Sequence, residues 1–269
     1  MERTVKDVMH IGIITCPTSL TLGALTLQLV EHKIHAVFVE NERGSIVGVI
    51  SDIDLLTGEW LFRGEESLIT LLSVTAGELM SSPVISVAVD EQLQSVAALM
   101  AERRFHRLLV TEAGKPVGVI SVSDVVRALG RQEVIQRTVE EVMSRAIVVC
   151  REDTPLPAVA RGMSERRSRS VIVVSSNGTP KGIITGLDLI QLASDPGFES
   201  KLAGEVMHAP ITISPQASLR DAADTMITHH VHRLLVVHPE QPDSMPLGII
   251  STSDIMIEMA QPGSTWQQA

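Results

Sequence analysis

The chain has 269 residues, a formal net charge of −10, 44% hydrophobic residues and only 2% aromatic residues. Phosphate backbones and anionic membranes attract chains with an excess of Lys and Arg, and this chain is acidic, so neither nucleic acid nor membrane is an expected partner. Apolar runs are too short for a membrane span, and the polar start is unlike a signal peptide, which predicts a cytoplasmic protein. Cys16 and Cys150 are expected to be small buried residues and not a disulfide.

Hydrophobic periodicity and turn residues predict the element order β-α-β-β-α four times along the chain. The first repeat has predicted strands at 11–15, 36–39 and 46–50 and helices at 20–32 and 52–62. The second has strands at 84–87, 107–110 and 117–120 and helices at 93–103 and 125–129. The third has strands at 147–149, 171–174 and 181–184 around a helix at 156–166. The fourth has strands at 211–213, 233–237 and 247–250 around a helix at 219–228.

These repeats predict an α/β (α+β) fold of four domains, at residues 3–66, 75–131, 138–196 and 202–262. One repeat alone would leave a face of its sheet exposed, so we expect tandem pairs that pack sheet to sheet with pseudo-twofold symmetry. The joint over 63–75 is too apolar for a free linker and is expected to pack, with a second subunit as one candidate for the surface that it contacts.

One seven-residue pattern recurs at the predicted end of the hairpin in every repeat. It consists of a glycine, two β-branched aliphatic residues, a hydroxyl residue, two variable residues and an aspartate, and its starts lie 70, 64 and 66 residues apart (48 to 118, 118 to 182, 182 to 248). Such a period indicates a repeat protein. The hydroxyl residues are Ser51, Ser121, Thr185 and Ser251, and the aspartates are Asp54, Asp124, Asp188 and Asp254.

Two interpretations of the Ser/Thr-x-x-Asp pattern remain open. It is close to a capping box, in which the hydroxyl and the acid satisfy free backbone groups at a helix start. Capping alone does not require Asp over Glu or Gln in all four copies. A short carboxylate at a fixed place can instead accept two sugar hydroxyls, while helix N–H groups face an anion.

Basic residues cluster where the first helix of each repeat gives way to the second strand. Lys33, Arg104, Arg167 and His230 lie two residues before His35, His106, Arg169 and His232. Arg presents a planar fork to phosphate oxygens, and His would make such binding depend on pH. Cations are also favoured at any helix C-terminus, so each residue has a purely structural alternative.

As a set, these motifs resemble four CBS domains, named after cystathionine β-synthase, arranged as two Bateman modules over nearly the whole chain. The resemblance implies a non-catalytic regulatory module that binds AMP, ADP or ATP in clefts between paired repeats, with S-adenosylmethionine or a cyclic dinucleotide as alternatives. It implies that the four aspartates hold a ribose diol and that the hydroxyl residues lie near ribose or phosphate. Residues of the basic bend would reach phosphates: Lys33, Arg104, His106, Arg167, Arg169, His230 and His232.

The resemblance further implies a homodimer that regulates an unknown protein partner and requires no cofactor. A structural assembly subunit with empty clefts remains an alternative, and an enzyme is disfavoured because no catalytic set of residues appears. The histidines at 32, 35, 229, 230 and 232 straddle helix ends and lack a Cys or carboxylate at ligand spacing, so no metal site is expected.

Overall fold

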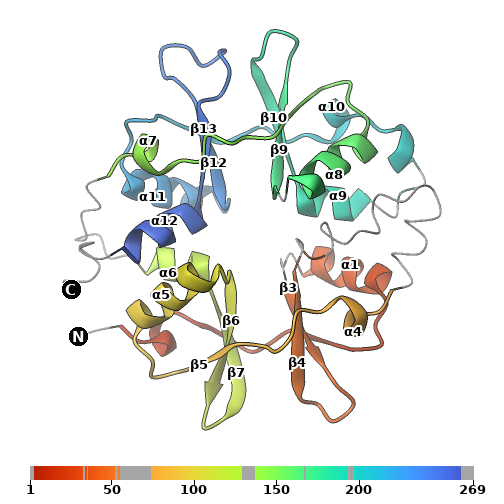
Figure 1. Ribbon diagram of the computed structural model, residues 1–269, viewed down its shortest axis with the longest axis vertical. Coiled ribbons are helices and arrows are strands. Elements are labelled where there is room, and N and C mark those ends of the chain that lie inside the picture. Colours follow the sequence, from red (N-terminus) through yellow and green to blue (C-terminus); the bar gives the residue numbers. More distant parts are fainter. Residues whose placement is uncertain are drawn as a thin grey trace. The chain divides into compact units, whose positions relative to one another are not determined.

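The structure is a computed structural model. It describes residues 3–32, 34, 36–51, 54, 74–128, 137–166, 168–192, 195 and 197–261. The chain forms two compact units, shown in Figure 1. Unit 1 comprises residues 1–13, 85–146 and 211–269, and unit 2 comprises residues 14–84 and 147–210. Unit 1 therefore contains the second and fourth repeats, and unit 2 contains the first and third.

Each repeat builds a three-stranded sheet in which the first two strands are parallel and the last two form an antiparallel hairpin. The sheets of unit 2 are β2 (Thr15–Pro17), β3 (Ala36–Glu40) and β4 (Ile46–Ser51), and β8 (Val149–Arg151), β9 (Ser170–Val174) and β10 (Pro180–Thr185). Those of unit 1 are β5 (Ser86–Ala88), β6 (Arg107–Glu112) and β7 (Lys115–Ser121), and β11 (Thr212–Ile213), β12 (Arg233–Val236) and β13 (Gly248–Ser251). The predicted α/β fold class is confirmed.

Two sets of helices accompany these sheets. The connecting helices are α1 (Leu22–Glu31), α5 (Leu93–Arg103), α8 (Leu156–Glu165) and α11 (Leu219–His229). The helices that follow the hairpins are α6 (Val122–Arg127), α9 (Gly186–Leu192) and α12 (Thr252–Met259). The helix predicted over 52–62 and the joint over 63–75 lie outside the described residues, except for 54, 74 and 75. No helix of the described residues is long and apolar enough to cross a membrane.

Each unit has one hydrophobic core to which both of its repeats contribute. The connecting helices insert side chains with the same spacing in every repeat, which is the helical period predicted from the sequence. These fully or almost fully buried residues are Leu93, Val96 and Met100; Leu219, Ala222 and Met226; Leu22, Leu25 and Leu29; and Leu156, Val159 and Met163. In unit 1, α12 packs against α5 and α6 (Figure 1). The sheet-to-sheet pairing of tandem repeats stays a prediction.

A short segment opens each repeat, and we call these four segments the leaders. They contain η1 (Val5–Asp7), α4 (Ala76–Leu79), α7 (Val139–Val142) and α10 (Ala203–Val206). Their Asp or Glu caps the local helix. In the second leader, the hydroxyl and backbone N–H of Thr75 lower the pKa of Glu78. Met143 is buried, and the equivalent methionines Met9, Met80 and Met207 are half-buried.

Every leader packs against a repeat other than its own. The first leader continues as β1 (His10–Ile11), which pairs antiparallel with β7 of the second repeat. The other leaders form isolated antiparallel bridges. The residue after the leader methionine pairs in each case with the residue after the motif glycine: His10 with Val119, Ser81 with Val49, Ser144 with Ile249, and His208 with Ile183.

This close approach explains the glycine that begins each motif. A Cβ atom on Gly118 would lie 2.2 Å from the carbonyl oxygen of His10, and one on Gly182 would lie 2.6 Å from Cβ of Met207. Neither an oxygen nor a carbon atom can lie so close to a Cβ atom, so only a residue without a side chain fits. The motif glycine is therefore required by the leader and not by a turn.

Candidate functional site

The four motif aspartates occupy equivalent positions in the first turn after the hairpin. One oxygen of each carboxylate, Oδ2, accepts hydrogen bonds from the Ser or Thr three residues earlier. The distances are 2.7–2.8 Å to the backbone nitrogen and 2.5–2.7 Å to the side-chain hydroxyl oxygen. The capping interpretation is therefore confirmed at Asp54, Asp124, Asp188 and Asp254.

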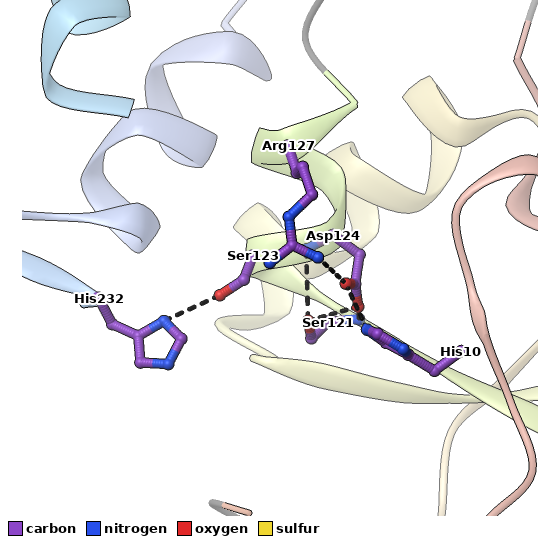
Figure 2. A network of polar contacts seen from close by, with 6 residues as sticks. All are labelled: His10, Ser121, Ser123, Asp124, Arg127 and His232. Atoms are coloured by element: carbon purple, nitrogen blue, oxygen red, sulfur yellow. Dashed lines mark hydrogen bonds and ion pairs between the residues drawn. The ribbon is translucent and has the colours of Figure 1, made fainter. Parts of the chain in front are cut away.

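The second carboxylate oxygen, Oδ1, takes no part in this capping. At Asp124 it lies 2.9 Å from Nε2 of His10 and 3.6 Å from Nη1 of Arg127 (Figure 2). At Asp188 it lies 3.0 Å from Nε2 of His208. Among the described residues, none bonds Oδ1 of Asp54 or Asp254. Capping thus engages one oxygen of each aspartate and leaves the other for a different partner.

The side chains of Asp124 and Asp188 are 3% and 16% exposed, and Asp54 and Asp254 are half-buried. Each carboxylate sits at the carboxyl end of the last strand of its sheet, where the capping bonds fix its rotamer. A fixed, partly desolvated carboxylate binds hydroxyl donors more strongly than one that is mobile in water.

The basic bends lie beside the starts of the helices that carry the aspartates. Backbone carbonyls at the bend accept from the first N–H of the second helix in the same repeat: His106 from Val122, Arg169 from Gly186, and His232 from Thr252. These hydrogen bonds hold each bend next to the motif of its own repeat.

In unit 1, two histidine side chains cross from one repeat to the other. Nδ1 of His232 lies 3.0 Å from Oγ of Ser123, which directly precedes Asp124 (Figure 2). Nδ1 of His106 lies 3.1 Å from Oγ of Ser253, which directly precedes Asp254. Sequence reasoning placed these histidines at the bend of their own repeat and did not predict that they reach the motif of the other. At the positions of Ser123 and Ser253, the first and third repeats have Ile53 and Leu187 instead.

Arg104 and His230 end α5 and α11 in the left-handed backbone region, with φ of 57° and 54°. Glycine is the usual residue there, because a Cβ atom raises the energy of this conformation. A side chain at this position therefore costs backbone energy that glycine would avoid. Lys33 and Arg167, predicted at the equivalent place, lie outside the described residues.

His10 and His208 are polar partners of the candidate aspartates that sequence reasoning missed. Both follow the leader methionine, a position held by Ser81 and Ser144 in the other two leaders. No pattern in the sequence indicates that a leader contacts the motif of another repeat.

Metal and thiol chemistry find little support in the described part of the chain. It contains no group of three or more His, Cys, Asp or Glu side chains able to hold a metal ion. Cys16 and Cys150 are free thiols, which confirms that they do not form a disulfide. Burial raises the pKa of both thiols to about 11, so they are protonated at neutral pH.

Comparisons with known proteins agree with the repeat pattern. The family model of the CBS domain matches residues 5–59, 76–131, 139–195 and 203–261. The uncharacterised protein MJ1225 of Methanocaldococcus jannaschii is 23% identical over 71% of this chain and 70% of its own. MJ1404 of the same organism is 27% identical over 71% of this chain and 45% of its own.

Solved structures show the same fold. The crystal structure of MJ1225, a proposed archaeal homologue of g-AMPK, matches with a TM-score of 0.82 at 21% identity, over 94% of this chain and 99% of that chain. A conserved uncharacterised protein from Pyrococcus horikoshii matches with a TM-score of 0.63 at 24% identity, over 94% of this chain and 98% of that chain.

Proposed function

Because the chain belongs to the CBS domain family, with four domains within residues 5–261, we propose that it is a non-catalytic regulatory module for adenosyl nucleotides. The ligand class is AMP, ADP or ATP, and binding requires no additional cofactor. The ribose of each nucleotide binds to a motif aspartate. The four candidate positions are Asp54, Asp124, Asp188 and Asp254.

The observation that carries this proposal is the Oδ1 oxygen left over after capping. The capping bonds hold Oδ2 and orient the carboxylate, so Oδ1 has a fixed direction. A carboxylate oxygen accepts hydrogen bonds only, and a vicinal diol offers two adjacent donors. Ser51, Ser121, Thr185 and Ser251 already donate to Oδ2 and so act mainly by orienting the carboxylate.

The phosphates of the nucleotide bind to the basic bends in this proposal. His106 and His232 support it, since their side chains lie beside the residue that precedes Asp254 and Asp124. Arg104 and His230 support it through their left-handed backbone. Lys33, Arg167 and Arg169 complete the proposed set.

Regulation follows from the histidines that cross between repeats in unit 1. When the ribose of a nucleotide binds Asp254, the phosphates of the same nucleotide would contact His106 of the other repeat. Its binding energy then depends on how the two repeats are oriented, so the ligand favours one orientation. We propose that an unknown protein partner recognises that orientation, and that the chain functions as a homodimer.

Isothermal titration calorimetry against AMP, ADP, ATP, S-adenosylmethionine and a cyclic dinucleotide tests the proposal. We expect saturable binding of at least one adenine nucleotide, with no turnover of the bound ligand. Absence of heat from every compound at millimolar concentration would contradict the proposal.

A structural subunit whose sites stay empty is the second candidate. The observation in its favour is that His10 and His208 already bond Oδ1 of Asp124 and Asp188. Replacing both aspartates with Ala distinguishes the candidates. If the melting temperature in the presence of nucleotide is the same for the variant and the parent, the structural function gains support.

A further inference from the structure

The residue after the leader methionine has the same backbone position in all four repeats. Each is paired antiparallel with the residue after a motif glycine, and that residue lies five positions before the motif aspartate. Side chains at these four positions therefore start from equivalent points relative to the carboxylate. The residues are His10, Ser81, Ser144 and His208.

Only the two histidines are long enough to reach the carboxylate. His10 bonds Oδ1 of Asp124 and His208 bonds Oδ1 of Asp188, at 2.9 and 3.0 Å between nitrogen and oxygen. The imidazoles themselves are largely exposed, at 69% and 66%. Each imidazole therefore covers a more buried carboxylate from the solvent side. A serine at the same position makes no such bond to Asp54 or Asp254 among the described residues.

We propose that His10 and His208 divide the four sites into two classes with different affinity for nucleotide. This inference rests on the proposed function. Asp54 and Asp254 present Oδ1 directly to a ribose diol and form the open class. Asp124 and Asp188 form the latched class, in which the diol must first displace the imidazole from Oδ1.

Displacement makes the latched sites weaker because one hydrogen bond to the carboxylate is exchanged for another. At an open site the ligand gains that bond without losing an existing one. Arg127 adds a further contact to Oδ1 of Asp124, at 3.6 Å, and the third repeat has Gln191 at the corresponding position.

The two classes are distributed evenly over the molecule. Unit 1 holds the open Asp254 and the latched Asp124, and unit 2 holds the open Asp54 and the latched Asp188. At low nucleotide concentration, we therefore expect two nucleotides per chain, one in each unit. The latched sites fill only at higher concentration.

The chain supplies its own substitutions for a test, since serine is the natural residue in the other two leaders. Calorimetry with AMP compares the parent protein with the double variant His10→Ser and His208→Ser. We expect the parent to bind two equivalents of AMP tightly and two further equivalents with a Kd at least about tenfold higher. A tenfold change in Kd corresponds to about 1.4 kcal/mol of binding free energy. The double variant should bind all four with similar affinity.

The reciprocal variant Ser144→His should convert the Asp254 site to the latched class. The number of AMP molecules bound tightly per chain should then fall from two to one. His238→Ser, in the loop after β12, should leave the titration unchanged. Thermal unfolding without ligand confirms that each variant is folded.

Three results would overturn the inference. If the double variant has the same affinities for AMP as the parent, the histidines do not restrict the sites. If the double variant binds AMP more weakly than the parent, the histidines bind the nucleotide instead. Both leave the proposed function intact, because AMP still binds. If neither protein binds AMP, ADP or ATP, the proposed function fails together with the inference.

Discussion

Each motif aspartate can cap a helix and bind a ligand at once, because the two roles use different oxygens. The sequence pattern predicted both roles but could not separate them, since it carries no information about which oxygen meets which donor. The structure assigns Oδ2 to the helix cap at all four positions. The ligand-binding role of Oδ1 remains a prediction.

Replacing Asp254 with Asn tests that role at the residue scale. An amide oxygen still accepts the capping bonds, but an amide NH₂ can replace the oxygen that a diol needs. We expect loss of about 1 kcal/mol of stability from the weakened cap and loss of one nucleotide-binding site. Urea unfolding and calorimetry measure the two effects.

Asp221 is the matched control for this variant, because it caps α11 through Ser218 in the same way and lies outside the motif. Asp221→Asn should cost similar stability and leave nucleotide affinity unchanged. Equal loss of affinity in both variants would mean that capping alone explains the motif.

Arg104 offers a second residue-scale prediction, in which stability and binding change in opposite directions. Arg104→Gly removes a side chain from a left-handed position and should stabilise the fold by up to about 1 kcal/mol. It also removes a proposed phosphate donor, whose charge-assisted bond is worth about 1.5–3 kcal/mol, so affinity for AMP should fall about tenfold or more.

Arg103→Gly provides the comparison, because Arg103 carries the same charge but lies in the last turn of α5. That variant should lose about 1 kcal/mol of stability and keep its affinity for AMP. Unchanged AMP affinity in Arg104→Gly would remove Arg104 from the phosphate site.

At the scale of elements, local features were predictable and contacts between repeats were not. The helix predicted over 93–103 matches α5, because periodic apolar residues mark it. The helix predicted over 125–129 begins earlier, at Val122, because Ser121 caps it. The contacts that leaders make with other repeats have only indirect signals in the sequence. These are the motif glycines and the acidic residue that stands two positions before the methionine of every leader.

Gly118→Ala tests the role of the glycine as a contact point for a leader. The new methyl group would meet the carbonyl oxygen of His10 at 2.2 Å, so β1 must shift away from β7. We expect a loss of stability on the order of 1–3 kcal/mol, measured by urea unfolding.

Gly162→Ala is the opposite case, since a Cβ atom at this position in α8 meets nothing within 4 Å. Alanine should stabilise the helix there by about 0.5–1 kcal/mol. If both alanine variants had the same stability, the leader contact would contribute nothing at Gly118.

At the scale of the whole molecule, sequence reasoning identified the four repeats but did not predict that alternate repeats share a hydrophobic core. Hydrophobic periodicity predicted the fold class, and repetition of Gly-x-x-Ser/Thr-x-x-Asp identified the candidate aspartates. The compact units, however, combine alternate repeats, and each has a single core built by helices of both. Such grouping depends on complementary surfaces, which no local pattern encodes.

The central claim is that a carboxylate oxygen of the motif aspartates holds a ribose diol. The most direct measurement compares the affinity of the protein for AMP and for 2′,3′-dideoxy-AMP by calorimetry. The account predicts that loss of both hydroxyls weakens binding at least tenfold, because hydrogen bonds to a charged group are lost. Equal affinity for the two compounds would contradict it.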